Sequence, residues 1–227
     1  MSVDRQDCLS YIQRRTDNHV CLLISPHLCY NPRMPNEIST SRRHLPHWQL
    51  DGAVYWVTFR LADSVPQALL REWQAKRAEW LDAYPQPWDA EVLDEYNKLF
   101  GDKFEKWLDD GMGSRALARA DVKNIVRECL LFSDGTRHTL HAAVIMPTHV
   151  HCLLEPHDGW KLPQLLKSIK GISANKINKL LGKNGTFWQD ESFDHIVRSE
   201  LQYDHYLMYI KENPARAGLK ADEWWMK

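Results

Sequence analysis

Two apolar segments of strand length follow one another with only Pro147-Thr148 between them. The first is Thr139–Met146 (TLHAAVIM) and the second is His149–Leu154 (HVHCLL). Because two residues are too few for a helical crossover, the segments are predicted to pair as adjacent antiparallel strands. The chain is therefore expected to be built around a sheet, with His149–Leu154 as a central strand.

The segments before and after this pair have residue patterns that are typical of either a strand or a helix. Ala53–Leu61 is rich in β-branched and aromatic residues, whereas Arg119–Leu131 repeats apolar residues at helical spacing. The other predicted elements are a helix over Pro163–Leu181 that stops at Gly182, a strand over Phe193–Val197, and a last helix over Glu200–Asn213 that ends at Pro214. The order β-α-β-β-α-β-α predicts an α+β fold, a ferredoxin-like sandwich with an additional C-terminal helix.

A strongly acidic segment interrupts this order. Between Gln67 and Gly111 eleven acidic residues stand against six basic ones, a net charge of −5. A helical pattern runs to the break at Tyr84-Pro85-Gln86-Pro87, and a second helix is predicted over Ala90–Leu108. We expect residues 66–112 to be an inserted acidic helical hairpin within a single domain of residues 46–227, and residues 1–45 to be a poorly ordered N-terminal arm.

Composition is typical of a globular protein. The chain has 227 residues, 44% hydrophobic and 26% charged, and no apolar run approaches the ~20 residues that span a membrane. Its first residues lack the basic head and apolar stretch of a secretory signal. Five cysteines without a Cys-x-x-Cys pair argue against a disulfide framework or a cysteine-rich zinc module. A soluble cytoplasmic protein with reduced thiols is expected.

The net charge of −1 conceals one basic segment. From Lys161 to Trp188 there are six lysines and no acidic residue. Such a segment is either a solvated helix face or a surface for a polyanion, and the charge pattern alone leaves both interpretations open.

His149 and His151 lie two residues apart on the predicted central strand, so their side chains project from the same face. Two adjacent imidazoles among Val150, Cys152 and Leu153 would be expensive to bury unless each had a partner, and a divalent metal is the obvious shared one. The spacing therefore predicts a metal site.

The last helix carries a phenol and a carboxamide at helical spacing. Tyr209 and Asn213 are four residues apart and project from one face, about one turn from each other. That geometry suits a nucleophile beside a metal ligand. On this helix alone, the simpler interpretation is a Tyr209 ring packed in the core and an Asn213 that ends the helix before Pro214. Tyr206, one turn before Tyr209, is a rival nucleophile.

Three strings in a fixed order resemble the signatures of a known family. They are Met146–Leu154 (MPTHVHCLL), Gly185–His195 (GTFWQDESFDH) and Tyr209–Leu219 (YIKENPARAGL). Together with His44–Ala53 (HLPHWQLDGA) they are similar to those of the REP-associated tyrosine transposases, domesticated relatives of the single-tyrosine, His-hydrophobe-His (HUH) transposases of the IS200/IS605 kind. A His-x-His pair alone is a weak signal, whereas three ordered motifs with a basic helix between them are a strong one.

The resemblance implies a metal-dependent endonuclease and strand transferase for single-stranded DNA that acts next to short palindromic (REP-type) hairpins. It implies that His149, His151 and Asn213 bind the metal and that Tyr209 is the nucleophile. A phenol with an ordinary pKa of ~10 is a poor nucleophile at neutral pH, and Mg²⁺ or Mn²⁺ would help by polarising the scissile phosphate. A 5′-phosphotyrosine would store the bond energy, so that the strand is rejoined without ATP.

The resemblance also implies a role in transposition or DNA recombination. It further implies a cytoplasmic, nucleoid-associated bacterial protein, either monomeric or homodimeric, with DNA and no membrane as its partner.

Further residues are candidates for contact with DNA: Lys170, Lys176, Lys179, Trp188, His195, Arg42 and Arg43. The lysines would bind the phosphate backbone of the DNA. Trp188 and His195 would stack on or contact unpaired bases, although Trp188 fits a core position equally well. The two arginines would enter a groove of the hairpin stem.

Two other classes of protein stay open. One is a non-catalytic nucleic-acid hairpin-binding module derived from a transposase. The other is a metal-dependent hydrolase of small phosphate esters that uses a bound water and does not need Tyr209. The sequence has no phosphate-cradling Gly-rich loop and no Ser-centred elbow, which argues against nucleotide-hydrolysing and acyl-transfer enzymes.

Overall fold

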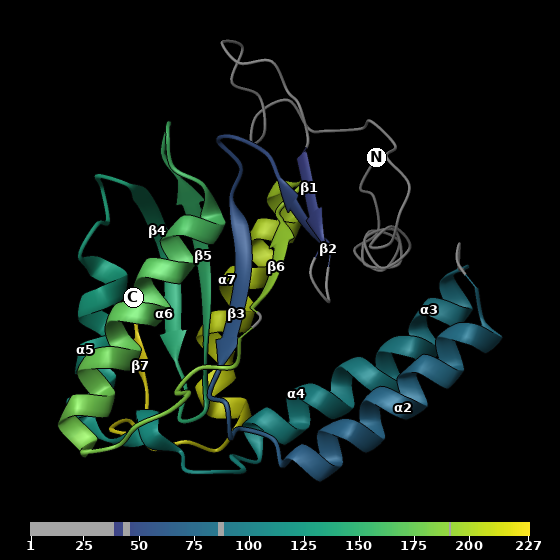
Figure 1. Cartoon of the computed structure of the whole chain (residues 1–227). Helices are drawn as coiled ribbons and strands as arrows, with labels where there is room; N and C mark the ends of the chain where they lie inside the picture. Colours follow the sequence, from purple (N-terminus) through teal and green to yellow (C-terminus); the bar gives the residue numbers. More distant parts are fainter. Residues whose placement is uncertain (1–38, 43–45, 86–88, 191) are drawn as a thin grey trace. The chain divides into compact units, whose positions relative to one another are not determined.

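The computed structural model describes residues 39–42, 46–85, 89–190 and 192–227. Within them the chain divides into two units (Figure 1). A helical unit comprises Val65–Asp110, and a larger unit comprises the described residues before Val65 and after Asp110.

The larger unit is organised around a five-stranded antiparallel sheet in the order β6-β3-β5-β4-β7. Its strands are β3 (Tyr55–Arg60), β4 (His138–Ile145), β5 (His149–Pro156), β6 (Phe193–Ile196) and β7 (Trp225–Met226). β4 and β5 are antiparallel neighbours with Ile145 opposite Val150, as the two-residue connection predicts. β5 lies in the middle of the sheet, so the predicted central strand is confirmed.

Three helices cover the sheet: α5 (Ala120–Leu131), α6 (Leu162–Leu181) and α7 (Glu200–Arg216). α5 and α6 pack on one face and α7 on the other (Figure 1). The element order β3-α5-β4-β5-α6-β6 and the strand order β6-β3-β5-β4 define a ferredoxin-like sandwich. The predicted α+β fold is therefore confirmed, with α7 as the additional C-terminal helix.

Alternation along β5 decides which side chains meet α7. Val150, Cys152 and Leu154 join the apolar cluster on the side of α5 and α6, whereas Leu153 joins the cluster on the side of α7. Because successive residues of a strand point to opposite faces, His149 and His151 face α7 together with Leu153.

The end of α7 differs from the prediction. The helix continues through Pro214 to Arg216 instead of ending at Asn213. Ala217 N–H donates to the Asn213 carbonyl at 3.0 Å and Leu219 N–H donates to the Pro214 carbonyl at 2.9 Å. Proline removes one donor, but near a helix end the following residues still close the last turn.

A two-stranded sheet forms outside the predicted elements. β1 (Ser39–Arg42) pairs antiparallel with β2 (Pro46–Gln49). The predicted N-terminal arm therefore includes a strand near its end. Its other residues, 1–38 and 43–45, lie outside the described residues.

The helical unit consists of α2 (Gln67–Ala83), α3 (Ala90–Tyr96), the π-helical turn η1 (Asn97–Gly101) and α4 (Asp102–Asp109). α2 ends before Pro85, as predicted, whereas the second predicted helix is interrupted by the π-helical turn. Aromatic rings hold the helices together. Trp80 lies 5.3 Å from Tyr96 and 5.9 Å from Phe100 between ring centroids.

The segments of the larger unit that flank this insertion are joined to each other. Ser114 N–H donates to Asp63 Oδ2 at 3.0 Å. Gly113 has a φ of +83°, and a Cβ there would lie 2.1 Å from the Asp63 carbonyl oxygen, so this close approach requires glycine. We call Asp63, Gly113 and Ser114 the neck of the insertion.

Candidate active site

His149 and His151 lie together on the α7 face of β5. Both side chains are 0% exposed, and their ring centroids are 4.6 Å apart. The two imidazoles are therefore neighbours, as the i, i+2 spacing predicts. Their role as metal ligands stays a prediction.

A threonine hydroxyl contacts the Nδ1 atom of each histidine. Thr148 Oγ1 lies 2.9 Å from His149 Nδ1, and Thr58 Oγ1 lies 2.8 Å from His151 Nδ1. Thr58 reaches its partner across the β3–β5 pairing, where the two residues are opposite each other. In the tautomer with the proton on Nδ1, each Nδ1–H donates a hydrogen bond to the threonine hydroxyl oxygen, and Nε2 keeps its lone pair for a ligand bond.

Burial keeps both imidazoles neutral at physiological pH. It lowers the pKa of His149 to about 3. Burial also lowers the pKa of His151 well below its usual value, and the neighbouring His149 and Arg216 add to this effect. Neutral imidazole is the form that binds a metal ion.

α7 presents a phenol, a carboxamide and a guanidinium to the same place. Tyr209, Asn213 and Arg216 follow i, i+4, i+7 spacing and share one helix face. The Tyr209 ring lies 5.3 Å from the His151 ring and nearly perpendicular to it, and the Arg216 guanidinium lies 5.1 Å from the Tyr209 ring centroid. Asn213, between them, is 0% exposed.

The buried polar atoms at this place fit a divalent metal ion. Among the described residues, His149 Nε2 and both polar atoms of the Asn213 side chain are buried without a hydrogen-bond partner. Buried polar groups are normally satisfied, and an ion bound by imidazole nitrogen and amide oxygen would satisfy His149 Nε2 and Asn213 Oδ1. The described part of the chain has no group of three or more His, Cys, Asp or Glu that could hold a metal. A site here therefore depends on the Asn213 carboxamide as third ligand.

An aromatic stack fixes the orientation of these groups. The Trp56 ring is stacked with His151, at 5.0 Å and 15°, and with Tyr206, at 4.5 Å and 6°. Tyr209 meets the Trp56 ring edge-on at 5.4 Å. Burial raises the pKa of Tyr206 to about 12.

Sequence reasoning gave no role to Trp56, Thr58 or Arg216. The first two could have been found from the pairing of β3 with β5, because residues 56 and 58 alternate onto the face of the histidines. Arg216 could have been found from its seven-residue spacing to Tyr209, had the helix not been predicted to end at Asn213.

His141 and Glu155 form a separate group on the same face of the sheet. His141 Nε2 lies 2.8 Å from Glu155 Oε2, and Tyr203 Oη lies 3.2 Å from His141 Nδ1. A bulge in β4 between Leu140 and Ala142 produces this placement of His141. The three side chains tie the first half of α7 to the sheet.

The lysines of α6 differ in their surroundings. Lys176 and Lys179 are exposed on the helix. Lys170 Nζ instead donates to the Asp190 carbonyl at 2.8 Å and to Ser192 Oγ at 3.0 Å. The helix ends at Gly182 with a φ of +62°, as predicted.

Burial corrects one predicted DNA contact. Trp188 is 4% exposed, packs against Phe59 and donates its indole N–H to Ser173 Oγ at 2.9 Å. Its ring is part of the core, because burying a large aromatic ring is favourable. A ring that is buried in this way cannot stack on a base.

The other predicted DNA contacts lie elsewhere. His195 is partly buried, with Nε2 at 3.0 Å from Gln202 Nε2 on α7. Arg42 is the last residue of β1, and Arg43 lies outside the described residues. These residues are not brought together with the α6 lysines by any described contact.

Comparison with known proteins gives a family match for the part of the chain that carries this site. The family model described as transposase IS200-like matches residues 115–213. This range contains both histidines, Tyr209 and Asn213, and over it the resemblance to IS200-type transposases is confirmed. No curated protein sequence matches the chain.

The solved structures that are similar to the chain include two transposases. One is a REP-associated tyrosine transposase bound to a REP hairpin, with 17% identity, a TM-score of 0.47, and coverage of 80% of this chain and 76% of that one. The other is a crystal structure described as a transposase of Deinococcus radiodurans, with 18% identity, a TM-score of 0.33, and coverage of 76% of this chain and 96% of that one.

None of the described helices combines the length and the apolar character needed to cross a bilayer.

Proposed function

We propose that the protein is a metal-dependent single-stranded DNA endonuclease and strand transferase in which Tyr209 is the nucleophile. One observation carries the proposal. The Tyr209 phenol lies beside His151, on the helix face of Asn213, where His149 Nε2 and the Asn213 carboxamide are buried without partners in the described structure. A water-using hydrolase would not need a tyrosine at this place.

In the proposed reaction the Tyr209 oxygen attacks the scissile phosphorus. A phosphorus–oxygen bond to tyrosine forms, and the bond from phosphorus to the 3′-oxygen breaks. The phenol loses its proton and the departing 3′-oxygen gains one, which leaves a 5′-phosphotyrosine and a free 3′-hydroxyl. Attack by a 3′-hydroxyl on the phosphotyrosine reverses these changes and rejoins a strand.

The surrounding residues would bind, orient and screen the reacting groups. Arg216 places a positive charge 5.1 Å from the Tyr209 ring centroid, which favours the phenolate that develops during attack. His149, His151 and Asn213 would hold Mg²⁺ or Mn²⁺, which when bound would polarise the scissile phosphate and neutralise its charge. The Trp56 stack holds His151 and Tyr209 in fixed relative positions.

The proposed substrate is a DNA strand next to a palindromic hairpin. This part of the proposal is supported by the three ordered sequence motifs and by the family model over residues 115–213. The exposed α6 lysines Lys176 and Lys179 offer positive charge for its backbone.

A covalent trapping experiment tests the proposal. The protein is mixed with labelled single-stranded oligonucleotides that carry genomic palindromes, with Mg²⁺, with Mn²⁺ or with EDTA, and analysed on denaturing gels. We expect a protein-linked band that requires the metal. DNA binding with no adduct under any metal would instead identify a non-catalytic hairpin-binding module.

A further inference from the structure

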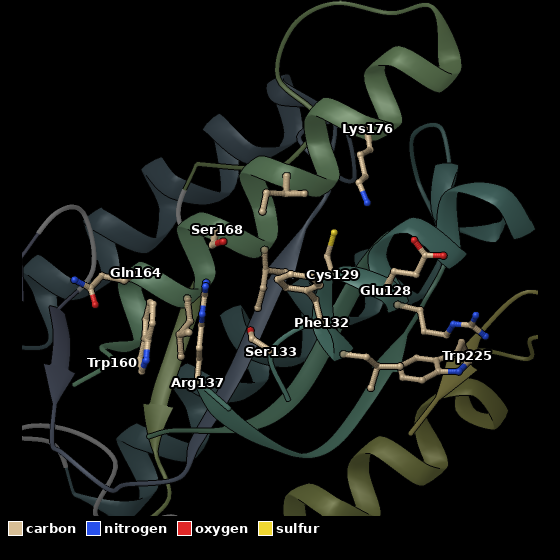
Figure 2. A pocket seen from close by; sticks show the side chains of 15 residues that line it. Glu128, Cys129, Phe132, Ser133, Arg137, Trp160, Gln164, Ser168, Lys176 and Trp225 are labelled. Carbon is tan, nitrogen blue, oxygen red and sulfur yellow. The ribbon is translucent and has the colours of Figure 1, made fainter. Parts of the chain in front are cut away.

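A cavity lies on the face of the sheet opposite to the candidate active site. Residues of α5, α6 and β7 and of adjoining loops line it, and its volume is about 610 Å³ (Figure 2). Because α5 and α6 cover one face of the sheet and α7 the other, this cavity is separate from His149, His151 and Tyr209. Its volume lies within the range of small-ligand sites, ~300–1,000 Å³.

Aromatic rings border the cavity. Phe132, which directly follows α5, is 79% exposed. Trp160 and Trp225 are partly buried and pack on the core. In the view of Figure 2, Phe132 lies between these two tryptophans. A phenyl ring exposed to this degree gains by stacking on a flat apolar partner.

The charged residues around the rings are mainly basic. Arg127, Arg137 and Lys176 line the cavity together with a single acidic residue, Glu128. The Arg137 guanidinium lies 4.5 Å from the Trp160 ring centroid. Lys176 also belongs to the lysine-rich segment of α6, in which no acidic residue occurs.

We propose that this cavity binds an unpaired nucleobase of the DNA strand, with the neighbouring phosphates on Arg127, Arg137 and Lys176. The inference rests on the proposed function, which supplies single-stranded DNA as the ligand. Aromatic faces bind any base by stacking, and cations beside them follow the backbone. An apolar peptide would use the rings but leave the cations unpaired, whereas a nucleotide uses both.

An abasic scan tests the site. Affinities of a labelled single strand are measured by fluorescence anisotropy in EDTA, with one base removed at a time, for the wild type, Phe132→Ala and Leu99→Ala. Leu99 is a matched control because it is an exposed apolar residue of the helical unit, 45% exposed. Phe132→Ala should fold normally because the ring is exposed.

We expect one position at which removal of the base weakens binding to the wild type and to Leu99→Ala by about fivefold or more. In Phe132→Ala the same removal should have no further effect, since the stacking partner is already gone. The proposal is overturned if Phe132→Ala weakens binding equally for every oligonucleotide or not at all.

Two further arms separate this inference from its alternatives. If a free deoxynucleoside monophosphate competes at the concentration at which the oligonucleotide binds, the cavity is a small-molecule site and the proposal is overturned. Metal-dependent adduct formation is measured on the same three proteins. If an adduct forms but removal of a base and Phe132→Ala weaken binding independently, only the proposed base site in the cavity is refuted. If the two effects depend on each other but no adduct forms, the base site is supported and the proposed chemistry is refuted.

Discussion

At the level of single residues, substitution of a threonine that contacts one of the two histidines tests the metal site most directly. We expect Thr58→Val to lower the affinity for Mn²⁺ by about tenfold or more, because the Thr58 hydroxyl orients the His151 ring. Isothermal titration calorimetry measures this affinity. Thr139→Val is the matched control, since Thr139 Oγ1 makes a similar 2.8 Å bond to His157 Nε2 outside the site. Equal affinities in both variants would contradict the account.

A second residue-level prediction concerns pH. Burial lowers the pKa of His195 from 6.5 to about 4. The unfolded chain therefore binds a proton at pH 5.5 that the folded chain excludes, and stability is lost as the pH falls from about 6.5 towards 4. Between pH 7.5 and 5.5 we expect the free energy of unfolding of the wild type to fall by about 1 kcal/mol more than that of His195→Gln. Urea unfolding at the two pH values measures the difference, and equal falls would refute it.

The site residues could be predicted from sequence where local spacing decides their direction. His149 and His151 follow from the two-residue period of a strand, and Tyr209 with Asn213 from the four-residue period of a helix. Burial is decided by non-local packing, which no spacing reveals. The placement of Trp188 in the core therefore required the structure.

At the level of elements, the lysines of α6 differ in their surroundings. Lys170 is hydrogen-bonded to Asp190 and Ser192, whereas Lys176 and Lys179 are exposed. We expect Lys179→Gln to reduce the slope of log affinity against log salt by about 0.7 for single-stranded DNA, because one phosphate contact is lost. Lys161→Gln should leave the slope unchanged, since Lys161 Nζ lies 2.5 Å from Asp51 Oδ1. Fluorescence anisotropy over a salt series measures both, and identical slopes in all three proteins would contradict a DNA contact on α6.

The helix end at Gly182 could be predicted from sequence, whereas the end of α7, the β4 bulge and the π-helical turn could not. α6 ends at Gly182 because that residue adopts the left-handed conformation. α7 passes through Pro214 because hydrogen bonds from Ala217 and Leu219 close its last turn. The β4 bulge and the π-helical turn η1 depend on pairing and packing, which the hydrophobic period does not record.

At the level of the whole molecule, the neck shows how the insertion is accommodated. Asp63 and Ser114 are joined at 3.0 Å within the larger unit, so the chain ends left by removing residues 66–110 are already close. We expect a variant with a short Gly-Ser linker in place of these residues to keep the sheet and to form the metal-dependent DNA adduct. Circular dichroism and denaturing gels check the two outcomes. A folded variant without adduct would show that the insertion takes part in the reaction.

The central claim is that Tyr209 forms the covalent bond to DNA. The decisive measurement is tandem mass spectrometry of the trapped complex after trypsin and nuclease digestion, because the peptide Ser199–Lys211 carries Tyr203, Tyr206 and Tyr209 together. The account predicts a nucleotide 5′-phosphate on Tyr209 in the wild type and in Tyr206→Phe, and no adduct in Tyr209→Phe. A nucleotide on Tyr206, or an adduct that persists in Tyr209→Phe, would contradict it.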